Sequence, residues 1–104
     1  MGRMEPTVDF QSLVEASVRS NATQEARKEI NVSKAIIYAE EALANDAQVP
    51  PGRSIDEDWL FAWRDYAGRV STEDLQKLWG NVLAGEVKSP GTYSVRTLEF
   101  IRGL

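Results

Sequence analysis

The spacing of apolar residues, three and four positions apart along most of the chain, is the feature that most constrains the fold. The clearest example follows Ser71 and consists of Leu75, Leu78, Trp79, Val82 and Leu83. Such spacing places side chains on one face of an α-helix, whereas a half-buried strand needs strict alternation, which is rare here. The pattern therefore predicts an all-α fold, a small bundle of four or five helices.

Five helical segments are expected from this periodicity and from start and stop signals. They cover about residues 8–20, 22–44, 54–70, 71–88 and 94–104. The main break lies at about residues 45–53 and contains Pro50, Pro51 and Gly52, which favour turns. We expect residues 1–21 to form an N-terminal arm with a short helix, and residues 22–104 to form one helical domain.

Serines in front of apolar stripes mark the expected helix starts. Ser54 with Glu57, and Ser71 with Asp74, match the capping box, in which the hydroxyl accepts a free helix N–H and the acid lies near the positive end of the dipole. We expect Ser54, Ser71 and Ser94 to be N-cap residues.

Tryptophan side chains are either core residues or flat surfaces that stack on nucleobases and sugars. Trp59, Trp63 and Trp79 all fall on apolar helical stripes. Their positions favour packing in the core over ligand binding.

One polar pair is expected to fix a corner between the last two helices. Glu86 and Arg96 flank Pro90 and Gly91, which favour a turn with positive φ at the glycine. A bidentate bridge between the carboxylate and the guanidinium would hold this turn, although Glu99 competes for the same arginine. A ligand-binding arginine is the alternative interpretation.

The composition removes most familiar catalytic and metal-binding groups. The chain contains no cysteine and no histidine, so thiol nucleophiles, thiolate sites and imidazole bases are excluded. The carboxylates of Asp56, Glu57 and Asp58 are candidate ligands for a divalent cation, but their place in a first helical turn favours capping. We expect no catalytic residue, no metal and no cofactor.

The balance of charge disfavours nucleic acid as a partner. Twelve basic residues stand against 16 acidic ones, which gives a net charge of −4 and a pI near 4.8. The densest basic spot, Arg27 and Lys28 with Lys34 nearby, is interleaved with Glu25 and Glu29, so a solvated face is favoured over a phosphate contact. No apolar run is long enough to span a membrane, and we expect a cytoplasmic protein.

Four motifs in the chain have a recognisable counterpart: DEDWL at 56–60, VSTEDLQKLW at 70–79, LAGE at 83–86 and PGTYSVRTLE at 90–99. Over about residues 22–104 the chain resembles an uncharacterised bacterial and phage family with the signature DDDWL, LWxxxLAGE and PGxxSxRTLxxL. The resemblance implies no activity and no catalytic residue. Members of that family are typically longer, which implies an excised or shortened chain with a surface left open.

These observations favour an interaction or oligomerisation module without catalytic activity. Part of the surface of the long helix is expected to need a partner, because its apolar residues lie around more than one face: Ile30, Val32, Ile36, Ile37 and Leu43. A symmetric dimer is the simplest solution, and another protein is the alternative partner. A small nucleic-acid-associated regulator and a carboxylate-dependent metal-binding enzyme fragment are the rival hypotheses.

Overall fold

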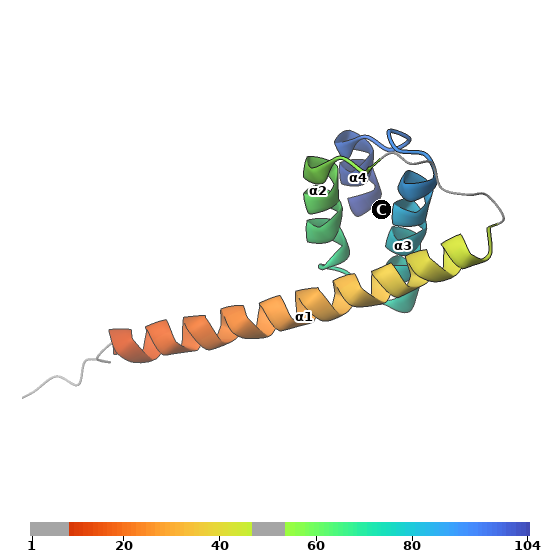
Figure 1. Ribbon diagram of the computed structural model, residues 1–104. Helices are drawn as coiled ribbons and strands as arrows, with labels where there is room; N and C mark the ends of the chain where they lie inside the picture. Colours follow the sequence, from red (N-terminus) through yellow and green to blue (C-terminus); the bar gives the residue numbers. More distant parts are fainter. Residues whose placement is uncertain (1–8, 47–53) are drawn as a thin grey trace, which may run out of the picture.

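The computed structural model describes residues 9–46 and 54–104, and over these ranges the chain folds into four helices without a strand. They are α1 (Phe10–Ala44), α2 (Glu57–Ala67), α3 (Glu73–Lys88) and α4 (Val95–Arg102). Helices α2, α3 and α4 stand together, and α1 crosses them on one side (Figure 1). The expected all-α bundle is confirmed, while Pro50, Pro51 and Gly52 lie outside the described residues.

The first helix is longer than the sequence pattern suggests. Two segments, 8–20 and 22–44, were expected, but α1 runs without interruption for 35 residues, so the expected boundary at 21 and 22 lies inside one helix. Asp9 caps it by accepting the N–H groups of Gln11 and Ser12. No proline or glycine interrupts the helix, and Thr23 donates its hydroxyl to the Arg19 carbonyl at 2.9 Å, which satisfies this group within the helix.

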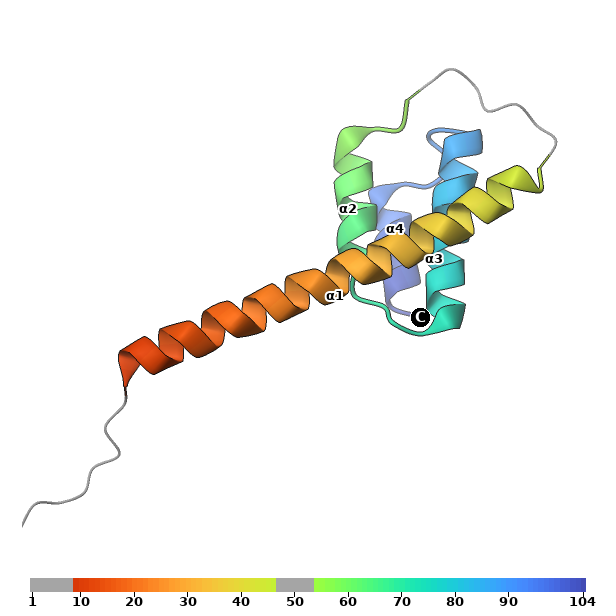
Figure 2. The same ribbon diagram turned by 60° about the horizontal axis from the view of Figure 1, so that its bottom comes forward.

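The C-terminal half of α1 covers the bundle, chiefly along α3, and its N-terminal half projects well beyond it (Figure 2). Val32, Ala35 and Ala39 are the fully buried residues of α1. Ile30 and Ile37, in contrast, are more than half exposed, so the helix buries one side only.

The tryptophans form the centre of the core, as expected from their stripes. Trp59, Trp63 and Trp79 are at most 3% exposed, and they pack with Leu98 of α4. The indole N–H of Trp63 donates to the Trp79 carbonyl at 2.8 Å, so this buried polar group is satisfied. The predicted stripe of α3 is confirmed at Val82 and Leu83 but not at Leu75, which is exposed.

Helix α3 approaches α1 closely at Gly80. A Cβ atom at this position would lie 2.6 Å from the Ala35 carbonyl oxygen and 2.7 Å from the Tyr38 Cβ. Because both distances are shorter than van der Waals contact, only glycine allows the two backbones to come this near.

Replacing Gly80 by alanine tests this contact. Alanine is the better helix former by about 1 kcal/mol, yet overpacking against α1 should lower the free energy of unfolding by about 1–3 kcal/mol. Urea denaturation followed by tryptophan fluorescence measures the change. Asn81→Ala is the matched control, because Asn81 is exposed in the same helix and its replacement should be neutral or slightly stabilising. A Gly80→Ala protein as stable as the parent would contradict the close approach.

Candidate functional site

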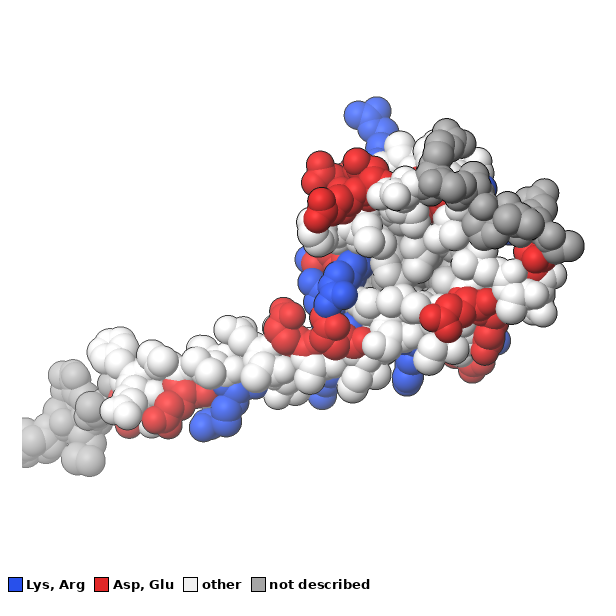
Figure 3. All heavy atoms as spheres, viewed as in Figure 1, with Lys and Arg blue, Asp and Glu red and all other residues white. Residues whose placement is uncertain are grey.

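The N-terminal half of α1 is the part of the molecule that lies open to solvent on all sides. Every residue from 10 to 27 is exposed, and Lys28 is the first half-buried residue of the helix. We call residues 10–27 the α1 extension. At about 1.5 Å per residue it is about 27 Å long. It carries both charged and uncharged surface along its length (Figure 3).

Four large apolar side chains lie exposed on the α1 extension. Phe10 is 75% exposed, Leu13 53%, and Val14 and Val18 60% each. Their spacing places them toward one side of the helix. Val14 precedes the buried Val32 by 18 residues, or five full turns, so this side continues the one that packs into the bundle. An apolar strip with no tertiary cover is a candidate binding surface.

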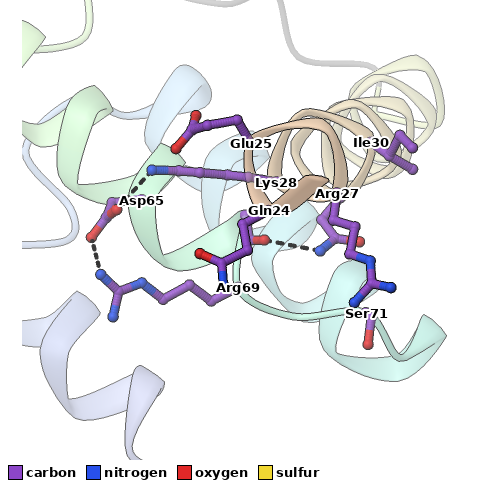
Figure 4. A pocket seen from close by; sticks show the side chains of 10 residues that line it. Gln24, Glu25, Arg27, Lys28, Ile30, Asp65, Arg69 and Ser71 are labelled. Carbon is purple, nitrogen blue, oxygen red and sulfur yellow. Dashed lines mark hydrogen bonds and ion pairs between the residues drawn. The ribbon is translucent and has the colours of Figure 1, made fainter. Parts of the chain in front are cut away.

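A groove lies where the α1 extension meets the bundle, and it gathers basic side chains (Figure 4). Arg27 and Lys28 of α1 lie with Arg69, which follows α2. Lys28 Nζ is 2.9 Å and Arg69 Nη2 3.0 Å from the carboxylate of Asp65. The hydrogen bond from Lys28, with the charges of both bases, holds the pKa of Asp65 below its ordinary value of 3.8.

These pairs assign a structural task to most of the basic cluster. Lys28 and Arg69 both pair with Asp65, and Lys34 lines a different hollow with Tyr38 and Glu41. The basic residues noted in the sequence therefore do not form one continuous positive patch on the described part of the chain.

Further bonds attach the base of the α1 extension to the bundle. Arg64 of α2 pairs with Glu29 of α1, and the side-chain amide of Asn31 donates to the Gly68 carbonyl at 2.9 Å. Together with the Lys28 pair, they connect α1 to α2 and the loop after it. The direction in which the α1 extension leaves the bundle is thereby set.

Two of the three expected serine caps are wrong. Asp56 caps α2, accepting the Trp59 N–H at 3.0 Å, while Ser54 lies two residues earlier in an exposed position. Glu57 is the first helical residue, near the positive end of the dipole, rather than the third. A carboxylate is as good an N-cap acceptor as a hydroxyl, and the helix begins at the later of two competing signals.

At the start of α3 the cap expected at Ser71 is also wrong. Thr72 is the N-cap, and no side-chain hydrogen bond caps this end. Ser71 instead lines the groove at the base of the α1 extension (Figure 4). Ser94, in contrast, is confirmed as the cap of α4, because its hydroxyl accepts the Thr97 N–H at 3.1 Å.

The expected bridge between Glu86 and Arg96 does not form. Glu86 is 3% exposed, and its two carboxylate oxygens accept the backbone N–H groups of Gly91 and Tyr93, each at 3.0 Å. Arg96 is exposed on α4. Gly91 has a φ of +95°, as predicted for this turn. The turn directs its own backbone N–H groups at the Glu86 carboxylate. Backbone N–H donors satisfy the buried carboxylate of Glu86, so no second charged side chain has to be buried with it.

The cap assignment yields a paired test. Asp56→Ala removes the acceptor for the Trp59 N–H and should lower the free energy of unfolding by about 1 kcal/mol. Ser54→Ala alters an exposed residue before the helix and should change it by less than about 0.5 kcal/mol. Thermal or urea denaturation of both variants decides between the two caps. A larger loss of unfolding free energy from Ser54→Ala than from Asp56→Ala would show that Ser54 is the cap.

The buried carboxylate yields a second test. In Glu86→Gln the amide keeps one oxygen, so one of the two backbone N–H groups faces an NH₂ group. This variant should lose about 1–3 kcal/mol of stability. Glu99→Gln, on an exposed residue of α4, is the matched control and should be close to neutral. Equal stability of the two variants in urea denaturation would contradict the double acceptor role of Glu86.

Comparison with known proteins identifies a family for the chain and indicates no activity. The model of a family described as "Protein of unknown function (DUF2806)" matches residues 16–104, which include part of the α1 extension and the whole described bundle. Neither the curated proteins nor the solved structures contain a match. Within residues 9–46 and 54–104, no cluster of acidic side chains is arranged to hold a metal ion, and no helix is long and apolar enough to cross a membrane.

Proposed function

Since the chain belongs to DUF2806, a family of unknown function, we propose on structural grounds that it is a protein-interaction module that self-associates through the α1 extension. The observation that carries the proposal is the exposure of Phe10, Leu13, Val14 and Val18 on a helical segment whose every residue is exposed.

Binding a partner would stabilise such an exposed helical segment. A helix of this length without tertiary contacts is marginally stable in water, because most helical stability in proteins comes from packing of an apolar face. Burying the four exposed apolar side chains would contribute about 1 kcal/mol or more for each. A partner on this side would therefore stabilise the helix and remove apolar surface from water together.

The charge of the α1 extension permits a second copy as that partner. Although the chain carries a net charge of −4, residues 10–27 contain two acids, Glu15 and Glu25, and two bases, Arg19 and Arg27. Two such neutral segments approach each other without net repulsion. In a symmetric dimer one apolar patch serves both copies, so no second complementary surface is required.

A non-catalytic role is part of the proposal. Lys28, Asp65 and Arg69, three of the five charged groups that line the groove, are engaged with one another. Their mutual pairs hold helices together, which supports a structural task for the groove.

Sedimentation equilibrium tests the proposal. The apparent mass should rise from that of one 11.6 kDa chain towards twice this value as concentration increases from micromolar to hundreds of micromolar. Val14→Glu places a charge on the apolar side and should keep the mass at one chain throughout, because desolvating a carboxylate opposes association. Ala16→Glu, on another side of the extension, should associate like the parent. A parent mass of one chain at every concentration would rule out self-association.

A further inference from the structure

We propose that two copies of this chain pair their α1 extensions in antiparallel orientation, with Val18 of each copy facing Val18 of the other at the two-fold axis. The inference rests on the proposed function and specifies its partner and geometry. Three features of the α1 extension support it: a ridge of side chains graded in size, the length of the exposed segment, and the placement of its charges.

The ridge consists of residues four positions apart whose side chains become smaller towards the bundle. They are Phe10, Val14, Val18, Ala22 and Ala26, and all of them are exposed. Reversing one copy against the other places Phe10 opposite Ala26, Val14 opposite Ala22, and Val18 opposite itself. Large residues then face small ones, which is the condition for two helices to interdigitate without voids or clashes.

The length of the α1 extension selects the same register. Residues 10–27 are exposed, so Val18 lies near the middle of the free segment, eight residues after Phe10 and ten before Lys28, the first half-buried residue. If the second copy were shifted by one turn towards the bundle, its Phe10 would lie opposite Ile30. This position is beside the ion pairs that attach α1 to α2. A shift of one turn outwards would place Ala26 opposite position 6, which lies outside the described residues.

The charges also favour antiparallel pairing in this register. Glu15 faces Asn21 and Glu25 faces Gln11, so no two like charges oppose each other. The inward shift of one turn would instead oppose Glu15 to Glu25. A parallel pair would oppose every charge to itself along the whole contact, and antiparallel helix dipoles attract each other.

The i, i+4 ridge also limits the length of the contact. Because this row winds around the helix, the two rows face each other most directly near the two-fold axis. The closest contact is then made by Val14, Val18 and Ala22, and the charged ends approach less closely. The two bundles lie at opposite ends of the pair.

Single cysteine variants test the geometry directly, because the chain has no cysteine of its own. Val18→Cys brings two thiols together at the two-fold axis and should form a covalent dimer under mild oxidation. Two Phe10→Cys thiols would be about 24 Å apart along the axis, far beyond the Cα separation of about 7 Å that a disulfide tolerates. Ser20→Cys lies near the axis on the opposite side of the helix and is the matched control.

The expected result is cross-linking of Val18→Cys at least about ten-fold faster than of Phe10→Cys or Ser20→Cys. An equimolar mixture of Val14→Cys and Ala22→Cys should give chiefly the mixed disulfide, identified by mass spectrometry. Circular dichroism and tryptophan emission equal to those of the parent show that each variant folds. Rapid cross-linking of Phe10→Cys, or self-disulfides from the Val14→Cys and Ala22→Cys mixture, would establish a parallel pair and overturn this inference.

The outcome separates the inference from the proposed function. A parent that sediments as a dimer while Val18→Cys cross-links no faster than Ser20→Cys contradicts the register and leaves self-association intact. A parent that sediments as one chain at all concentrations contradicts both.

Discussion

The close approach of α3 to α1 at Gly80 is the contact on which the rest of the structure depends. The absence of a side chain there lets the Ala35 backbone come within a distance that excludes a Cβ atom. The contact determines where α1 crosses the bundle, and Trp63 and Trp79 fill the space beside it with a buried hydrogen bond. Because the crossing lies in the second half of a 35-residue helix, the first half has no helix left to pack on.

Polar side chains at the crossing set the direction of α1. Lys28, Glu29 and Asn31 each bond to α2 or to the loop after it. Partly exposed ion pairs of this kind are weak individually, and several together orient a helix better than they stabilise it. Of the basic residues noted in the sequence, Lys28 therefore serves as an attachment of α1 to α2.

Local signals predicted some features of the site and failed at others for a common reason. The cap at Ser94 and the positive φ at Gly91 depend on a few neighbouring residues and were predicted correctly. At the start of α2, Ser54 and Asp56 are both good caps, and packing of Trp59 and Trp63 sets the helix to begin after Asp56. The bridge from Glu86 to Arg96 was wrong because sequence spacing does not show that a turn can direct its own N–H groups at a buried carboxylate.

By itself the sequence determined that the chain is helical, which residues form apolar stripes, and that its tryptophans belong to the core. Only the tertiary structure decided which stripes are covered. Val14 and Val32 lie five turns apart on the same side of α1, yet one is 60% exposed and the other 2%. Periodicity identifies the apolar side of a helix, but burial depends on whether another element lies against that side, and here α3 reaches only the second half of α1.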